Sequence, residues 1–145
     1  MKLYVKRLHE NAILPERATP SSAGADLHAC LSEPVEILPG KTVMIPTGIA
    51  VQPSDASTAL LIFPRSGLAS KSGITLANAV GVVDSDYRGE IKVPLHNLSD
   101  QPFLVEHGMR IAQLVVMPVV FPALEETEVL EETERGSGGF GSSGI

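Results

Sequence analysis

The chain has 145 residues and a formal net charge of −6, and its composition suits one small domain. A nucleic-acid polymer is excluded as the main partner, because no basic stripe could neutralise a run of phosphates. Aromatic residues make up 4% of the chain and tryptophan is absent, so the core is expected to consist of aliphatic side chains.

The first half of the chain predicts short strands. Residues 2–8, KLYVKRL, alternate apolar and polar side chains as a half-buried strand does. Residues 35–53 indicate two strands separated by a Pro-Gly turn. Residues 59–69, ALLIFPRSGLA, predict a buried strand that runs into a sharp loop.

The second half continues this pattern. Residues 73–99 indicate a hairpin with the polar stretch DSDYRG (84–89) at its tip. Residues 103–121 predict two strands around a His-Gly turn, and only residues 66–74, SGLASKSGI, favour a helical turn or two. We therefore predict an all-β fold of the jelly-roll or barrel-like kind with one short helical segment.

The composition changes after Phe121. Six glutamates lie in residues 125–134, which we interpret as an acidic, solvated connector between a β-rich core, residues 1–124, and a glycine-rich C-terminal arm, residues 135–145. The arm has two interpretations. It is either a frayed end, or a lid in which the ring of Phe140 stacks on a nucleotide and Arg135 binds phosphate.

Cellular location is predicted from what the sequence lacks. The N-terminal residues MKLYVKRLHE contain no apolar run, and the most apolar stretch, residues 111–124, is interrupted by proline. The lone cysteine, Cys30, cannot form an internal disulfide and is expected to be buried and unreactive. We expect a soluble, cytoplasmic protein without a membrane partner.

No familiar motif for metal binding or covalent catalysis is present. The four histidines do not have metal-ligand spacing, and there is no GxSxG elbow. Polar residues instead stand in four short stretches within apolar surroundings. These are AGADL (23–27), PRSGLA (64–69), GVVDSDYRGE (81–90) and GMRIAQL (108–114).

Each stretch has a structural and a functional interpretation. Arg65 and Ser66 are either an ordinary strand-end turn or a phosphate contact, with Gly67 letting backbone N–H groups approach a ligand. Asp84 is either a turn former or a carboxylate that activates water. Asp26 fits either an Asx turn or a role near a metal ion, and Arg110 is expected to pair with a carboxylate.

Together with RGSGGFGSSG (135–144), these stretches resemble, in order and separation, the five sequence motifs of the trimeric deoxyuridine triphosphatase (dUTPase) family; the third motif spans NAVGVVDSDYRGEI (78–91). The resemblance implies hydrolysis of dUTP to dUMP and pyrophosphate. This reaction keeps uracil out of DNA and supplies dUMP for thymidylate synthesis. It also implies a homotrimer with shared active sites, in which the fifth motif comes from a neighbouring chain.

The resemblance also implies roles for individual residues. Asp84 is the general base that activates the attacking water, and Asp26 reaches Mg²⁺ through water while the substrate phosphates hold the ion. Tyr87 lies under the deoxyribose. The other implied substrate-binding residues are Arg65, Ser66, Gly67 and Gln113 on the phosphate side, Asn78, Gly81 and Val83 around uracil, and Arg135, Phe140 and Ser142 in the arm.

The sequence departs from the family pattern at one place, and two other functions are alternatives to dUTP hydrolysis. Ala79 and Val80 occupy a place where Ser-Pro is frequent in the family, so the entry to the hairpin is expected to differ slightly. A dCTP deaminase of the same fold would have a glutamate as its base and no GGFG tail. A non-catalytic dUTP-binding module would be expected to have lost Asp84 or Arg135.

Overall fold

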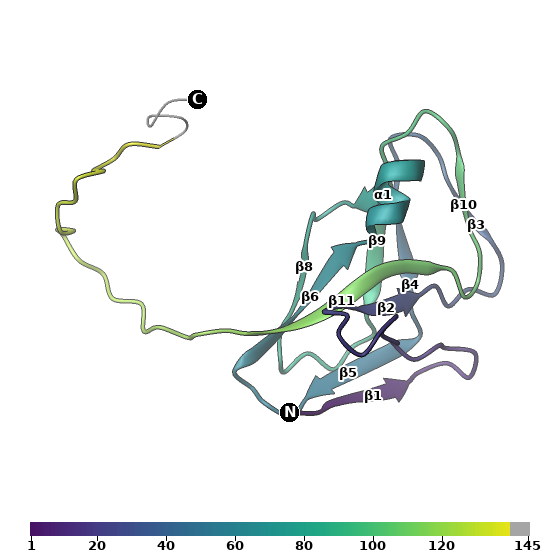
Figure 1. The fold of residues 1–145 in the computed structure, drawn as a ribbon, viewed down its shortest axis with the longest axis horizontal. Helices are drawn as coiled ribbons and strands as arrows, with labels where there is room; N and C mark the ends of the chain where they lie inside the picture. The colour runs from purple at the N-terminus through teal and green to yellow at the C-terminus, as the bar shows by residue number, and fades with distance from the viewer. Residues whose placement is uncertain (140–145) are drawn as a thin grey trace.

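In the computed structural model, residues 1–139 are described, and they form eleven strands and one helix (Figure 1). The strands are β1 (Leu3–Arg7), β2 (Ala25–His28), β3 (Val35–Ile37), β4 (Thr42–Pro46), β5 (Ile49–Pro53), β6 (Thr58–Pro64), β7 (Ile74–Leu76), β8 (Gly81–Val83), β9 (Lys92–Asn97), β10 (Phe103–Val105) and β11 (Arg110–Pro118). The helix is α1 (Ser66–Ser72). The predicted all-β fold with one short helical segment is confirmed.

Two larger sheets and two ribbons organise the chain. The four-stranded sheet has the order β2-β11-β6-β8 and the three-stranded sheet the order β4-β9-β7, while β1 pairs with β5 and β3 pairs with β10. Each of these pairings is antiparallel. Strand β11 is the longest and lies between β2 and β6. It therefore brings the polar stretches AGADL (23–27) and PRSGLA (64–69) to the same sheet.

The core between these strands is aliphatic, as the composition predicts. Its largest fully buried apolar side chains are those of Leu27, Ile37, Ile45, Ile49, Leu60, Ile74, Ile91, Leu95, Ile111, Val93 and Val105. β-Branched side chains are stiff and suit pleated strands, which explains why short strands rich in valine and isoleucine pack well here. Cys30, which we expected to be buried, is partly exposed beside this core.

Helix α1 follows β6 directly and ends at a glycine. Gly73 has φ of 65°, the left-handed conformation that glycine adopts without steric cost, and its N–H bonds the carbonyl groups of Leu68 and Ala69. The sharp loop predicted after β6 is therefore the start of this helix.

The predicted hairpin at residues 73–99 is wrong in its pairing. Strand β8 pairs with β6, opposite Leu60–Ile62, and not with β9. Both edges of β9 are already occupied, because it pairs with β4 on one side and β7 on the other. The segment between β7 and β9 thus leaves one sheet, adds an edge strand to another, and returns.

Beyond β11 the chain leaves the folded body. Residues 119–139 contain no strand or helix and extend away from the sheets (Figure 1). Among the residues described, no helix is long and apolar enough to cross a membrane.

Candidate functional site

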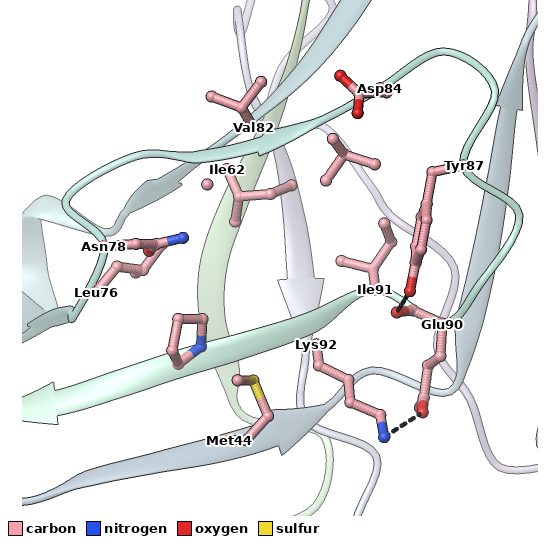
Figure 2. A pocket seen from close by; sticks show the side chains of 13 residues that line it. Met44, Ile62, Leu76, Asn78, Val82, Asp84, Tyr87, Glu90, Ile91 and Lys92 are labelled. Atoms are coloured by element: carbon pink, nitrogen blue, oxygen red, sulfur yellow. Dashed lines mark hydrogen bonds and ion pairs between the residues drawn. The ribbon is translucent and has the colours of Figure 1, made fainter.

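A pocket of about 310 Å³ opens between the edge strand β8 and the sheet that contains β4 and β9 (Figure 2). It gathers five of the predicted site residues, namely Asn78, Gly81, Val83, Asp84 and Tyr87. The sequence did not indicate the opposite wall, which Met44, Lys92 and Pro94 provide. These three residues lie on β4 and β9, and no local signal in the sequence shows that these strands face β8.

Asp84 lies at the rim of this pocket, directly after β8 (Figure 2). Asp84 is exposed to solvent, and its carboxylate has no hydrogen bond or ion pair within residues 1–139. The backbone carbonyl of Asp84 accepts a bond from the Tyr87 N–H at 3.1 Å, which closes a turn. The carboxylate is therefore free to accept a hydrogen bond from a water molecule at the pocket rim.

Tyr87 forms one side of the pocket, with its ring facing inward (Figure 2). Its hydroxyl donates to the carbonyl oxygen of Glu90 at 3.2 Å. The Glu90 carboxylate accepts from the Gly48 N–H at 2.9 Å and lies 3.6 Å from the Lys92 ammonium. Tyr87 is therefore tied through Glu90 to strands on the opposite wall.

Asn78 points into the pocket from the turn before β8 (Figure 2). The turn has an unusual backbone, because Ala79 has φ of 59° and is the only non-glycine residue with positive φ within residues 1–139. The N–H of Val80 bonds the carbonyl of Asn78 at 2.6 Å. A left-handed alanine is strained, and such strain is often found where a binding group must be held in place.

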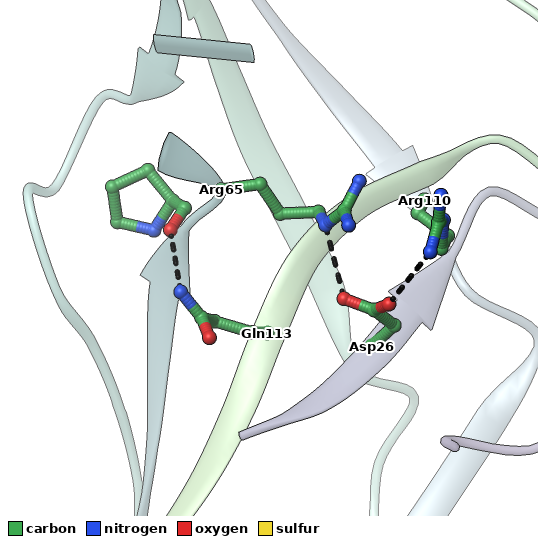
Figure 3. Close-up of polar contacts among 5 residues, drawn as sticks. Asp26, Arg65, Arg110 and Gln113 are labelled. Carbon is green, nitrogen blue, oxygen red and sulfur yellow. Dashed lines mark hydrogen bonds and ion pairs between the residues drawn. The ribbon is translucent and has the colours of Figure 1, made fainter. Parts of the chain in front are cut away.

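A second pocket, of about 370 Å³, lies near the joined ends of β2, β6 and β11. Its predicted members are Asp26, Arg65, Ser66, Gly67 and Gln113. Figure 3 shows the Asp26 carboxylate between two guanidinium groups, with Arg65 Nε at 3.0 Å and Arg110 Nη1 at 3.4 Å. The expected pairing of Arg110 with a carboxylate is confirmed.

Gln113 is positioned by strand register and by its backbone surroundings. It lies opposite Asp26 in the β2–β11 pairing, and its side-chain amide donates to the Pro64 carbonyl at 3.0 Å (Figure 3). A Cβ atom on Gly24 would come within 2.6 Å of the Gln113 amide oxygen. Only glycine fits there without displacing that side chain, which gives the AGADL stretch a structural reason for its Gly24.

Ser66 and Gly67 form the first turn of α1 at the wall of this second pocket. A Cβ added to Gly67 would meet no atom within 4 Å, so the space beside its backbone is open. Arg65, just before the helix, is partly exposed and reaches across to Asp26. This wall therefore offers one guanidinium, one hydroxyl and accessible backbone, which are groups that bind phosphate oxygens.

The two pockets share no lining residue, and strand register explains their separation. Val83 pairs with Leu60 at one end of β6, whereas Arg65 follows the other end. At about 3.4 Å per residue, the five-residue step from Leu60 to Arg65 corresponds to about 17 Å. Within one chain, Asp84 and Arg65 thus line different pockets, and their backbone positions lie near opposite ends of β6.

The pKa values of two groups near these pockets are shifted. Burial lowers the pKa of the half-buried His28, whose Nδ1 lacks a hydrogen-bond partner within residues 1–139, and the nearby Asp26 opposes this shift. Burial raises the pKa of the Cys30 thiol, with a further contribution from the Glu90 carboxylate. Both shifts favour the neutral forms of these side chains.

The predicted site residues of the arm fall into two sets. Arg135 is exposed on the extended segment, and its Nε donates to the Gly138 carbonyl at 2.8 Å. Phe140 and Ser142 lie outside the described residues. Neither pocket is lined by Arg135.

Within residues 1–139, no group of three or more His, Cys, Asp or Glu side chains is arranged so that it could hold a metal ion. Asp26 is the acidic residue that lines the second pocket, and its side chain is 16% exposed. Carboxylate oxygens suit Mg²⁺, so Asp26 fits an ion that other ligands help to hold.

A family model and the similar proteins of known function all identify the same family. The dUTPase family model matches residues 10–144. The deoxyuridine 5'-triphosphate nucleotidohydrolase of Legionella pneumophila (strain Paris) is 49% identical over 144 residues, which cover 99% of this chain and 95% of that protein. The enzyme of the same name from Idiomarina loihiensis is 50% identical with the same coverage.

Solved structures give the same picture. A Staphylococcus bacteriophage 80alpha dUTPase mutant with dUpNHpp superposes with a TM-score of 0.86 at 31% identity and covers 99% of both chains. A mutant dUTPase from phage phi11 of S. aureus, described with a structural Mg(II) ion, has a TM-score of 0.81 at 25% identity, over 91% of this chain and 100% of that one.

Proposed function

The chain belongs to the dUTPase family and hydrolyses dUTP, and we propose that its pocket beside β8 binds the nucleoside while the pocket beside Asp26 binds the phosphate chain. Water attacks the α-phosphorus and pyrophosphate leaves, which yields dUMP. Asp84 is the general base. The observation that carries this proposal is the exposed Asp84 carboxylate, unpaired within residues 1–139, at the rim of the pocket that also contains Asn78 and Tyr87.

Recognition of uracil is assigned to the free edge of β8. This strand is the last in its sheet, so only one of its edges is paired with β6. The other edge offers backbone N–H and C=O groups around Gly81 and Val83, which can pair with a base edge as a neighbouring strand would. The Asn78 amide adds a donor and an acceptor beside them.

Discrimination between deoxyribose and ribose is assigned to Tyr87. Its ring faces the pocket and its hydroxyl is held by the Glu90 carbonyl (Figure 2). A rigid ring at the sugar leaves little space for a 2′-hydroxyl. We therefore expect UTP to be a poor substrate.

The phosphate chain is assigned to Arg65, Ser66, Gly67 and Gln113. Arg65 supplies charge-assisted hydrogen bonds, and Ser66 lies where the charge on the leaving group develops. Asp26 would hold Mg²⁺ through its water shell, and the bound ion would neutralise charge on the triphosphate. The carboxylate suits this role because Arg65 and Arg110 fix its orientation.

One chain does not complete this site, so we infer a homotrimer with shared active sites. The separation of about 17 Å along β6 keeps Asp84 far from the Arg65 of its own chain. A general base must lie within hydrogen-bond reach of the water that attacks the phosphate. A neighbouring chain therefore supplies the missing half, and the number three comes from the family resemblance.

The C-terminal arm is proposed to close over the bound nucleotide. Residues 119–139, which lead into and begin this arm, extend away from the sheets and so support reach toward a neighbouring chain (Figure 1). Arg135 would meet the γ-phosphate and Phe140 would stack on uracil, with Ser142 as a further contact. Closure of such a segment excludes water and completes a catalytic site.

Substrate range is tested by pyrophosphate release with Mg²⁺ and dUTP, dTTP, dCTP or UTP in parallel. Turnover confined to dUTP is expected. Equal turnover of UTP would contradict the role of Tyr87, and equal turnover of dTTP would contradict a tight uracil pocket. A folded protein that binds dUTP but releases no pyrophosphate would be a nucleotide-binding module instead.

Shared sites are tested by mixing two impaired variants, Asp84→Asn and Arg65→Ala, after joint unfolding and refolding, and turnover is measured at a dUTP concentration below KM, where both variants are slow. If one site takes these residues from different chains, random assembly restores about a quarter of the sites. No recovery of turnover would show that both residues act from the same chain. Each variant refolded alone is the control.

A further inference from the structure

We propose that Arg88 is a positioning residue that holds the turn carrying Asp84 in its catalytic geometry. This inference rests on the proposed role of Asp84 as the general base. Arg88 does not line either of the two pockets described above. It would therefore act through the backbone of the turn and not through the substrate.

The turn itself has little backbone support. A single backbone bond closes it, from the Tyr87 N–H to the Asp84 carbonyl at 3.1 Å. Asp84 and Tyr87 are both exposed. Within residues 1–139 the Asp84 carboxylate has no partner, so the backbone of the turn decides where the carboxylate points.

Arg88 supplies the other bonds of this turn. Its Nη1 donates to the carbonyl of Ser85 at 2.7 Å and to the carbonyl of Tyr87 at 2.9 Å. Both distances are typical of good hydrogen bonds, and bonds from a charged donor are stronger than neutral ones. One guanidinium therefore fixes the orientation of two peptide groups within three residues of the general base.

Arg88 also lies beside the β1–β5 ribbon. Its side chain lines a surface hollow against the β1–β5 ribbon, together with Tyr4, Lys6 and Gln52. Five residues of β1 are paired with five of β5, which makes this ribbon a firm support. Arg88 thus lies between the exposed turn and this ribbon, and its hydrogen bonds are made to the turn.

The position of the turn matters for turnover because it sets the position of the Asp84 carboxylate. A catalytic group displaced by about 1 Å can lower the rate by a factor on the order of 100, even when binding is intact. Loss of Arg88 would leave the turn with one backbone bond. We therefore expect a fall in kcat with little change in KM.

The experiment compares Arg88→Ala, Arg88→Lys and the control Lys41→Ala, which removes an exposed cation that lines neither pocket. Steady-state turnover of dUTP gives kcat and KM. Amide hydrogen exchange is followed for residues 84–88 and for the core strands. Asp84→Asn is measured in parallel.

For Arg88→Ala we expect kcat to fall about tenfold, KM to stay within about twofold, and exchange to quicken only in residues 84–88. Arg88→Lys should recover most of kcat, because an ammonium can donate to both carbonyl groups. Lys41→Ala should match the unchanged protein. If Arg88→Ala does not fold, Arg88→Gln replaces it, with an intermediate kcat expected.

The inference is overturned if kcat for Arg88→Ala, or for Arg88→Gln in its place, equals that of the unchanged protein. A higher KM with unchanged kcat would also overturn it, since that result indicates direct contact with the triphosphate. Full activity of Asp84→Asn would refute the base itself. An inactive Asp84→Asn beside a fully active Arg88→Ala would refute only the role of Arg88.

Discussion

The pocket beside β8 and the pocket beside Asp26 differ in how each holds its aspartate, although the first pocket also contains the Glu90–Lys92 ion pair. In the second pocket the two charged lining residues, Asp26 and Arg65, form an ion pair at 3.0 Å, and Arg110 adds a second cation. In the first pocket the Asp84 carboxylate has no partner within residues 1–139. A paired charge has a fixed orientation suited to binding, whereas an unpaired carboxylate can accept a proton.

The sharpest test of this contrast is Asp84→Asn. Removal of a general base should lower kcat by about a thousandfold while affinity for dUTP stays nearly unchanged. Pyrophosphate release measures turnover, and calorimetry measures binding. Asp86→Asn is the matched control, because Asp86 is an exposed carboxylate on the same turn. Equal losses in both variants would show that the turn, and not one carboxylate, was damaged.

Deletion of residues 135–145 tests whether either pocket works without the arm. Turnover should fall about a hundredfold, because the phosphate contact of Arg135 and closure over the nucleotide are both lost. The melting temperature should not change, since the residues described in this segment lie outside the core. Size-exclusion chromatography would reveal dissociation into monomers, and that result would make the arm a structural element instead.

Arg65→Ala should mainly raise KM, in contrast to Asp84→Asn, which should mainly lower kcat. We expect KM for dUTP to rise about tenfold, because a guanidinium at the phosphate chain and the partner of Asp26 are removed together. Arg110→Ala is the comparison. Its pair with Asp26 is longer and its side chain is 54% exposed, so KM should rise only slightly. A larger effect of Arg110→Ala would reverse the proposed importance of the two cations.

Asn97→Ala should lower stability without changing turnover. Asn97 is fully buried, donates to Ile37 and Gln101, and accepts two bonds from Ser99. Leaving these groups unpaired should cost about 2 kcal/mol or more of the free energy of unfolding, measured with urea.

Asn11→Ala, an exposed asparagine, is the control for that variant. The kcat of Asn97→Ala should remain normal, because this residue lines neither pocket. A fall in kcat at temperatures where the protein is folded would link this buried node to the active site.

The sequence predicted most of the strands, because strand formation depends on local alternation of apolar and polar residues. It was wrong in two places, since residues 35–53 contain three strands, β3, β4 and β5, where two were predicted, and β2 was not predicted. Residues 2–8 and 103–121 contain β1, β10 and β11 as expected, and residues 66–74 contain the helix. The error at residues 73–99 concerned which strands pair. Adjacent strands often form hairpins, but here β4 and β7 already occupy both edges of β9. No local pattern reports which edges are occupied.

The candidate site also has parts that the sequence could predict and parts that it could not. Asp26, Arg65, Asp84 and Gln113 could be selected from the sequence because polar residues stand out within apolar stretches. The residues that surround and position them could not be selected in this way. The bonds of Arg88 to the turn and the left-handed backbone of Ala79 depend on how the chain bends, and the wall formed by Met44 and Lys92 depends on distant strands.

By itself, the sequence determined the family and the reaction, and it indicated the residues that we propose for the site, because these depend on short motifs whose chemistry is local. Only the tertiary structure decided that Asp84 and Arg65 lie near opposite ends of β6, and that the Asp26 carboxylate is paired while the Asp84 carboxylate has no partner in the described part of the chain. The physical reason is that distance and charge pairing arise from contacts between strands far apart in the chain, and these contacts exist only once the sheets have formed.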